Sequence, residues 1–306
     1  PDGAAMTVIV TGASGFLGRH VVDWFLTQGR DVVALTRNPG RLDARARLRV
    51  VETDYTSFEL HPESTIVHLA GVRNTPGTAT DRLWNVNVEV TRRIGEAALR
   101  AGVRRFIHVG TALVLGPSAT PLDAHSPFAE SADPYISSKL AGVRALEAIE
   151  ELPLVTLLPS LIYGPDHRLA PNRITSHIRR LRDRRWRVAV SGASAPRNLV
   201  YVADVVQAIE RAEREAVGTR TVVAGDDVTQ ERFERAVYAA LNRKPALRIV
   251  VPGAVARTAT RAMDWTVRRD QGWSRRLETL LAPWCFRSSH PYTPLEQGIA
   301  QTVRSL

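Results

Sequence analysis

The clearest indication of the fold is the segment "TVIVTGASGFLG", Thr7–Gly18. Its β-branched opening is typical of a buried parallel strand, and apolar side chains recur at helical spacing from Phe16 onward. Gly12, Gly15 and Gly18 lie between strand and helix, where bare N–H groups and the helix N-terminus can face a phosphate. Glycines there permit a tight turn, a close approach to a pyrophosphate and helix–strand packing. The stretch therefore predicts a dinucleotide-binding turn, with an ordinary strand–turn–helix as the alternative.

Strand-like and helix-like segments alternate through the first half of the chain. After the first strand, strands are expected at Asp31–Thr36, Leu48–Glu52, Thr65–Leu69, Arg104–Gly110 and Leu154–Leu158. Helices are expected near Phe16–Gln28, Arg82–Ala101 and Pro134–Ile149. This alternation predicts an α/β fold with a Rossmann-type doubly wound parallel sheet, which binds ligands at the carboxyl ends of its strands.

After Pro159 the alternation loosens, and proline and arginine become frequent. Helices are expected at Asp204–Glu215, Thr229–Leu241 and Val255–Val267, with few regular strands between them. We therefore expect a nucleotide-binding domain over residues 6–160, to which the chain returns near residues 198–225. Residues 161–306 are expected to form a smaller, mostly helical substrate-binding part, and residues 1–5 a tail or a cloning remnant.

Composition narrows the classes of protein. The chain has 306 residues, 44% hydrophobic and 24% charged, as in an ordinary globular protein. It has no apolar run long enough to cross a membrane and no signal peptide at its start, so we expect no membrane partner and a cytoplasmic location. A single cysteine, Cys285, excludes an internal disulfide and a cysteine-based zinc site, and no metal site is predicted.

The segment "DPYISSK" places Tyr135 and Lys139 four residues apart, on one face of the expected helix. Only two of the 41 Lys and Arg residues are lysines, so Lys139 departs from the chain's preference for arginine. A compact ammonium can lower the pKa of a neighbouring phenol and hydrogen-bond ribose hydroxyls, which a guanidinium does less well. The pair indicates a catalytic phenol, and a surface Tyr–Lys pair is the alternative.

With these motifs in order, the sequence resembles the extended short-chain dehydrogenase/reductases, also called the NAD-dependent epimerase/dehydratase family. The motifs that carry the resemblance are "TGASGFLG", "VETDY", "VHLAGVR", "NVEVT", "HVGTALVLG", "DPYISSK", "LPSLIYGP", "RNLVYVADV" and "YTPLEQGI". They span nearly the whole chain.

The resemblance implies hydride exchange between a nicotinamide and a carbinol or carbonyl carbon. It implies Tyr135 as the proton donor or acceptor, Lys139 as its partner and Thr111 as a hydrogen-bond donor to the substrate oxygen. A packing threonine is the alternative for Thr111, because "VGT" departs from the usual "VSS". The cofactor-binding residues implied are Gly12, Ser14, Gly15, Phe16, Leu17, Gly18, Arg37, Asp54, Tyr55, Leu69, Ala70, Gly71, Asn87, Tyr135, Lys139 and Pro159. The substrate-binding residues implied are Arg73, Thr111 and Arg197.

The end of the second strand bears on the cofactor. An NAD-specific relative carries Asp or Glu there, which accepts from the ribose 2′-hydroxyl. This chain has Thr36, followed by Arg37 and, nearby, Arg41. A guanidinium binds a 2′-phosphate that a carboxylate would repel. NADP(H) is therefore preferred, NAD(H) stays open, and a solvated arginine is the alternative for Arg37.

The residues after Thr111 bear on the reaction. A 4,6-dehydratase of the family would carry Asp-Glu there, whereas this chain has Ala112 and Leu113. Exchangeable NADPH suits net reduction, so we expect a ketoreductase acting on a nucleoside-diphosphate 4-keto sugar. A nucleotide-sugar 4-epimerase with tightly bound NAD stays open. Leu158 and Leu161 stand where sugar-binding members often carry Arg and Asn, which leaves open an apolar, steroid- or flavonoid-like carbonyl as the substrate. Four tryptophans, Trp186, Trp265, Trp273 and Trp284, could line such a pocket, with core packing as the alternative that we favour for most of them.

Nine arginines make a basic cluster between residues 168 and 197: Arg168, Arg173, Arg179, Arg180, Arg182, Arg184, Arg185, Arg187 and Arg197. Arg197 falls where nucleotide-sugar members keep a phosphate-binding arginine, and most of the others suit a solvated face. The net charge of +10 also permits a nucleic-acid binder, and an NADP-binding sensor is a further non-enzyme alternative, but we expect neither. The resemblance implies a homodimer through the helices at Arg82–Ala101 and Pro134–Ile149.

Overall fold

The fold was analysed in a computed structural model, which describes residues 7–56, 58–73, 78–167, 169–183, 186–190, 195–266, 277–278 and 281–306. The expected tail at residues 1–5 lies outside the described residues.

A parallel sheet of seven strands forms the centre of the larger part, in the order β11-β7-β5-β4-β1-β2-β3. The strands are β1 (Val8–Thr11), β2 (Val32–Thr36), β3 (Leu48–Glu52), β4 (Thr65–His68), β5 (Arg105–Val109), β7 (Leu154–Pro159) and β11 (Arg220–Val223). The strand order reverses between β1 and β4, so the crevice outside their carboxyl ends is where this type of sheet binds its ligand. The predicted doubly wound sheet is confirmed. The expected strands begin and end within one residue of β2, β3, β4, β5 and β7, whereas β11 is a strand that the sequence did not predict.

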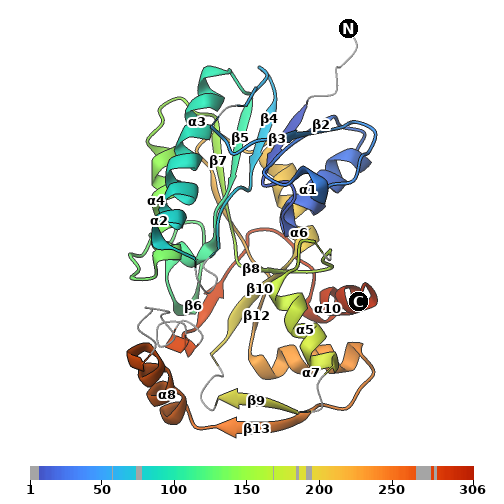
Figure 1. The fold of residues 1–306 in the computed structure, drawn as a ribbon, viewed down its shortest axis with the longest axis vertical. Coiled ribbons are helices and arrows are strands. Elements are labelled where there is room, and N and C mark those ends of the chain that lie inside the picture. Colours follow the sequence, from blue (N-terminus) through green and yellow to red (C-terminus); the bar gives the residue numbers. More distant parts are fainter. Residues whose placement is uncertain are drawn as a thin grey trace.

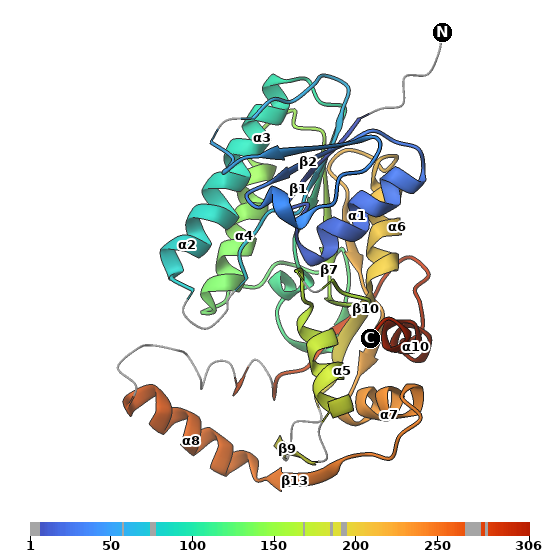
Figure 2. The same ribbon diagram turned by 45° about the vertical axis from the view of Figure 1, so that its right-hand side comes forward.

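Helices cover both faces of this sheet (Figures 1 and 2). One face carries α1 (Phe16–Thr27) and α6 (Val202–Ala212), whose apolar side chains share one core with the strands. The other carries α2 (Thr80–Trp84), η2 (Asn85–Val90), α3 (Thr91–Arg100) and α4 (Pro134–Glu147), around a second core. Both faces are thus buried, which explains the apolar strands.

The helix expected at Arg82–Ala101 has a π-helical segment, η2, in its middle. Such segments are uncommon and occur frequently at functional sites. Helix α4 approaches η2 closely: a Cβ added at Gly142 would lie 2.2 Å from the Asn87 carbonyl oxygen. A side chain at position 142 would therefore push apart the two helices that carry the motif residues Asn87 and Tyr135.

The smaller part contains more strands than the sequence predicted. A mixed sheet, in the order β12-β10-β14-β6 with β8 beside β10, holds it together. Its strands are β6 (Ser118–Leu122), β8 (Leu161–Tyr163), β10 (Arg197–Tyr201), β12 (Asp226–Val228) and β14 (Trp284–Phe286). A separate ladder joins β9 (Trp186–Val190) to β13 (Leu247–Val251). Further helices within the described ranges are η1 (Pro39–Arg41), η3 (Ala112–Leu115), α5 (Arg173–Asp183), α7 (Gln230–Ala240), α8 (Gly253–Thr266) and α10 (Leu295–Arg304).

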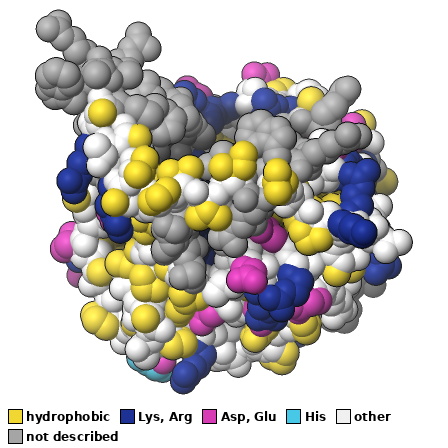
Figure 3. Space-filling view, turned by 90° about the horizontal axis from the view of Figure 1, so that it is seen from below, with side chains coloured by type: hydrophobic (Ala, Val, Ile, Leu, Met, Phe, Trp, Pro, Cys, Tyr) yellow, Lys and Arg dark blue, Asp and Glu magenta, His cyan; other side chains and the backbone are white. Residues whose placement is uncertain are grey.

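The end of the molecule that carries β13 and α8 is apolar at its surface. Figure 3 views the molecule from this end, where hydrophobic side chains gather beside residues that are not described. Leu247, Ile249, Val250 and Val255 are all about half exposed or more. None of the helices in the described ranges is long and apolar enough to cross a membrane.

Candidate functional site

The glycine turn after β1 leaves the start of α1 without a side-chain cap. Gly15 is the N-cap residue, no side chain accepts from the first amides, and no acidic residue lies in the first turn. Gly12 has φ +66°, and a Cβ there would lie 2.9 Å from the Ala70 amide nitrogen. A Cβ at Gly18 would lie 2.3 Å from the Gly12 carbonyl oxygen. The turn therefore needs its glycines, and the start of α1 offers an anion a helix N-terminus whose first amides have no side-chain cap, which fits a dinucleotide pyrophosphate.

A second turn, at the end of β4, lies against the first. The Thr11 hydroxyl accepts from the backbone N–H groups of Leu69 and Ala70, both at 3.1 Å. A Cβ at Gly71 would lie 3.2 Å from Asn87 Oδ1 and 3.9 Å from Lys139 Nζ. The two turns and the Lys139 ammonium thus border one space at the carboxyl end of the sheet.

Asn87 connects this second turn to the helix that carries the phenol. Its side chain is buried and pairs with the backbone of Val72, accepting from N–H at 2.8 Å and donating to C=O at 3.1 Å. Its amide also donates to Ser138 Oγ at 3.0 Å, and that hydroxyl donates to the Tyr135 carbonyl at 2.9 Å. Asn87 therefore lies behind the site as a support and its amide groups are committed.

Tyr135 and Lys139 occupy the first two turns of α4. Asp133 caps this helix by accepting from the amides of Tyr135 at 2.8 Å and Ile136 at 3.2 Å, with Pro134 at the first helical position. Lys139 is 7% exposed, and its Nζ donates to the Val109 carbonyl at 3.5 Å. Thr111 follows β5 at the start of η3, which packs against α4. Threonine, phenol and ammonium thus come from adjoining elements.

Burial dominates the electrostatics of the Tyr–Lys pair. It raises the pKa of Tyr135 to about 12, against which the Arg73 guanidinium acts. It also lowers the pKa of Lys139 to about 8. The sequence predicted that Lys139 would lower the pKa of the phenol; in the structure burial outweighs any such effect, and Arg73 is the cation that acts on Tyr135. Arg73 itself is exposed at the end of the β4 turn.

The carboxyl ends of β2 and β3 form the far side of the crevice. The Thr36 hydroxyl is buried, hydrogen-bonds Ser14 Oγ at 2.7 Å and accepts from the Asn38 amide at 3.1 Å, whereas Arg37 is exposed. Tyr55 is more internal than expected: its hydroxyl accepts from the Gly12 amide at 2.9 Å and donates to the Leu35 carbonyl at 3.2 Å. Tyr55 therefore supports the glycine turn from behind.

The other predicted cofactor residues differ in accessibility. Asp54 is exposed, and its carboxylate accepts from the Thr56 hydroxyl and amide. Phe16 is half-buried beside the His20 ring, and Leu17 packs between two of the cores. Pro159 is buried at the end of β7 beside Val223 of β11.

Arg197 lies at the start of β10, half-buried, with a second arginine nearby. Burial, and then the guanidinium of Arg173, lower the pKa of Arg197 to about 10. A polyanion would bind favourably between Arg197 and Arg173, because its negative charge would offset the repulsion between the two guanidinium groups. In the sequence, β7 and β8 lie between Tyr135 and these two arginines.

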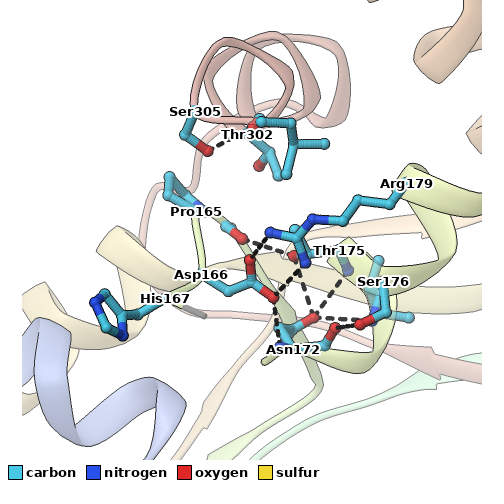
Figure 4. Close-up of polar contacts among 12 residues, drawn as sticks. Pro165, Asp166, His167, Asn172, Thr175, Ser176, Arg179, Thr302 and Ser305 are labelled. Carbon is cyan, nitrogen blue, oxygen red and sulfur yellow. Dashed lines mark hydrogen bonds and ion pairs between the residues drawn. The ribbon is translucent and has the colours of Figure 1, made fainter. Parts of the chain in front are cut away.

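Other members of the basic cluster have structural partners (Figure 4). Arg179 pairs with Asp166, whose side chain is fully buried, and Asp166 accepts from the Asn172 amide at 2.7 Å. Asn172 in turn accepts from the first amides of α5, which fixes the helix that carries Arg173. Arg182 pairs with Asp183. Arg168, Arg184 and Arg185 lie outside the described residues, as does the side chain of Arg187.

Several residues near the site serve packing. Leu158 is fully buried, and a Cβ at Gly110 would lie 2.9 Å from it, so its side chain packs beneath the strand end. The presence of leucine at position 158 therefore does not argue against a sugar substrate. Trp284 is buried in the same core, while Trp273 and the side chains of Trp186 and Trp265 lie outside the described residues. No group of three or more His, Cys, Asp or Glu side chains in the described ranges is placed to hold a metal.

Two histidines that the sequence analysis passed over lie under the site. His68 and His108 are register partners on β4 and β5, both fully buried, with rings stacked 5.4 Å apart. Burial lowers the pKa of His68 to about 3, assisted by Lys139, and lowers that of His108 well below 6.5. Each lies in a quoted motif and in an expected buried strand, His68 in "VHLAGVR" and His108 in "HVGTALVLG", and these positions were the signals that could have found them.

The lowered pKa values of these two histidines predict that acid destabilises the protein. Below pH 6.5 the histidines of the unfolded chain bind protons, whereas the buried rings of the folded chain stay neutral, so the free energy of unfolding decreases as the pH falls below 6.5. As the pH falls below 6.5, we expect each histidine to lower the unfolding free energy with a slope that steepens toward the limit of one proton, about 1.4 kcal/mol per pH unit. Urea unfolding at several pH values measures this slope. His108→Phe should reduce the slope by up to one proton, and an unchanged slope would contradict the assignment.

Comparison with known proteins adds independent findings. A family model described as "NAD dependent epimerase/dehydratase family" matches residues 8–225. The chain is 27% identical to the UDP-glucose 4-epimerase of Mycolicibacterium smegmatis over 97% of both chains. It is 30% identical to the sterol demethylase protein B of Methylococcus capsulatus, over 73% of this chain and 71% of that protein.

Solved structures share the whole fold. The crystal structure of gox2253 matches with a TM-score of 0.80 and 20% identity, covering 98% of this chain and 97% of the other. That of MoeE5 in complex with UDP-glucuronic acid and NAD matches with a TM-score of 0.72 and 25% identity, covering 98% of this chain and all of the other.

Proposed function

The chain belongs to the NAD dependent epimerase/dehydratase family of nicotinamide-dependent enzymes, and from this premise we propose that it is an NADP(H)-dependent ketoreductase of nucleotide-linked 4-keto sugars. The observation that carries the proposal is the meeting of the uncapped glycine turn, the β4 turn and the buried Lys139 beside Tyr135. The sheet-centred part, residues 6–160 with 198–225, is the proposed coenzyme domain, from which β6 and β10 extend to pair in the sheet of the smaller part. The rest of residues 161–306 is the proposed substrate part.

The residues have distinct proposed roles. When bound, the coenzyme supplies the hydride. Gly12 and Gly18 allow the tight turn and the close packing of the helix start, and Gly15, the exposed N-cap, lets the backbone approach the pyrophosphate. Lys139 and the Leu69–Gly71 turn face its nicotinamide half. Tyr135 donates the proton to the substrate oxygen, which Thr111 orients by a hydrogen bond. The Arg73 guanidinium favours the phenolate that proton donation leaves.

The preference for NADP(H) rests on the end of β2. Strand β2 contains no acidic residue, so it places no carboxylate near the ribose. Its last residue, Thr36, hydrogen-bonds Ser14 and Asn38, and the exposed Arg37 follows Thr36. Glu52, beside Thr36 in register on β3, is the acidic group that Arg37 must outweigh. A guanidinium binds a phosphate with charge-assisted hydrogen bonds.

We expect Arg37→Asp to weaken NADPH binding by about 1.5–3 kcal/mol and to leave NADH binding almost unchanged, because only NADPH carries the 2′-phosphate. Fluorescence titration with each coenzyme measures both affinities. Arg41→Asp is a control for the change of net charge. If the wild type binds NADH more tightly than NADPH, the coenzyme proposal is wrong.

Net reduction is favoured over dehydration by the apolar character of the segment after Thr111. Ala112, Val114 and Leu115 are buried and apolar, so this segment offers no acid or base for water elimination. Adding a 4-keto nucleotide sugar to enzyme with NADPH tests the proposal: coenzyme is consumed in proportion to product. Product formation without coenzyme consumption would refute it.

A nucleotide-sugar 4-epimerase is the second candidate. It is favoured by the likeness to a UDP-glucose 4-epimerase over 97% of both chains. This candidate predicts that NAD copurifies with the protein and that a 4-hydroxy nucleotide sugar is isomerised with no added coenzyme. Denaturing the purified protein and identifying the released nucleotide separates the two candidates.

We also propose a homodimer that pairs α2, α3 and α4 of each copy. Trp84 supports this proposal: on α2, beside η2, it is 43% exposed, which is unusual for a tryptophan. Light scattering on the purified protein reports the mass, and a monomer would refute the proposal.

A further inference from the structure

The hydrogen bonds around His68 determine where its proton lies. Thr11 Oγ1 accepts from the amides of Leu69 and Ala70 and lies 2.8 Å from His68 Nδ1. A hydroxyl has two acceptor positions and one hydrogen. Because the two amides fill both acceptor positions, the hydroxyl hydrogen must point at His68 Nδ1, which is therefore an unprotonated acceptor.

The other ring nitrogen continues the chain of contacts. With Nδ1 unprotonated, a neutral imidazole carries its hydrogen on Nε2. Nε2 lies 3.1 Å from Thr91 Oγ1 and donates to it. The Thr91 hydroxyl in turn donates to the Val86 carbonyl at 3.4 Å, in the π-helical segment η2 next to Asn87. A directed chain thus runs from the β4 turn through His68 to η2.

We propose that His68, in its neutral Nε2-protonated form, is a positioning residue that sets the Leu69–Gly71 turn for the coenzyme through the Thr11 hydroxyl. The inference rests on the proposed function only in taking the coenzyme as the ligand of that turn. The charged and titratable groups that face the ring are Lys139 of α4 and His108 of β5. The Lys139 ammonium disfavours a second charge on the ring and so keeps the acceptor available.

His108 provides a matched control. It has the same burial on the neighbouring strand, and within the described residues neither of its ring nitrogens has a hydrogen-bond partner. Removing its nitrogens in His108→Phe therefore breaks no hydrogen bond to either turn. Any loss of coenzyme affinity in a His68 variant that His108→Phe does not share belongs to the hydrogen bonds of His68.

Two conservative variants separate the two nitrogens. His68→Asn keeps an acceptor near the Nδ1 position for Thr11, and His68→Gln keeps a donor near the Nε2 position for Thr91. We expect His68→Asn to bind NADPH within about threefold of wild type, and His68→Gln and His68→Phe to bind about tenfold more weakly, because an unpaired buried Thr11 hydroxyl releases the turn. A purely structural role for His68 would lower the melting temperature without this ranking of affinities.

Nitrogen-15 NMR of the wild-type histidines tests the tautomer directly, without a variant that must fold. We expect an unprotonated Nδ1 and a protonated Nε2 for His68, assigned by the signal that His68→Asn removes. A protonated Nδ1, or equal affinities for His68→Asn and His68→Gln, would overturn the inference. If the wild type binds neither NADPH nor NADH, the proposed function itself is wrong, and the NMR result still decides the tautomer.

Discussion

Tyr135→Phe is expected to lower turnover by about 100-fold or more while NADPH still binds, because the ring stays and only the proton donor is lost. Tyr135 is in the first turn of α4. Its backbone N–H donates to the Asp133 carboxylate, and its backbone carbonyl accepts from the Ser138 hydroxyl. None of these contacts uses the hydroxyl. The variant should therefore fold with an unchanged melting temperature, and initial rates with saturating coenzyme measure the effect.

Tyr292→Phe is the control for this prediction, because that ring is 43% exposed in the segment before α10. It should leave the rate unchanged. A Tyr135→Phe enzyme with the wild-type rate would remove the phenol from the mechanism and leave Thr111 as the remaining candidate for proton transfer.

Arg197→Ala is expected to weaken the binding of UDP or dTDP by about 1.5–3 kcal/mol, up to about 150-fold, because charge-assisted hydrogen bonds to the diphosphate are lost. Arg173, which acts on Arg197, would retain part of the attraction. Isothermal titration of each nucleotide into wild type and variant measures the difference.

The basic cluster attracts anions in general, so the titration includes inorganic pyrophosphate and a higher salt concentration. Arg235→Ala, at an exposed position on α7, removes the same charge elsewhere and should not matter. Nucleotide binding should survive salt and exceed that of pyrophosphate. Should neither nucleotide bind while a steroid or aryl ketone is reduced, the sugar proposal fails and an apolar carbonyl takes its place.

The sheet and its helices were predictable because each leaves a local pattern. The β-branched runs of β1 and β2 are buried on both faces, and their periodicity does not depend on distant residues. The strands of the smaller part are different: β8, β12 and β14 have three residues each and pair with segments far away in the chain. Such strands exist through their partners, so local patterns do not indicate them.

The site was predictable as a set of motif residues but not as a network. Tyr135, Lys139 and the glycines were visible from their spacing. The roles of Thr11, His68 and Ser138 depend on hydrogen bonds between residues up to 59 positions apart, and these appear only in the fold. Leu158 shows the opposite error: a motif position suggested contact with substrate, whereas the side chain packs beneath Gly110.

Transfer of label from the coenzyme distinguishes net reduction of a keto sugar from epimerisation by a retained coenzyme. NADPH deuterated at the nicotinamide C4, on the transferred side, is supplied with a 4-keto nucleotide sugar, and the product is analysed by mass spectrometry. We expect one deuterium at the carbinol carbon for each coenzyme oxidised, and at least about 100-fold less labelled product with Tyr135→Phe over the same interval. A product that forms without deuterium, or an isomerised sugar with the labelled coenzyme unspent, would contradict it.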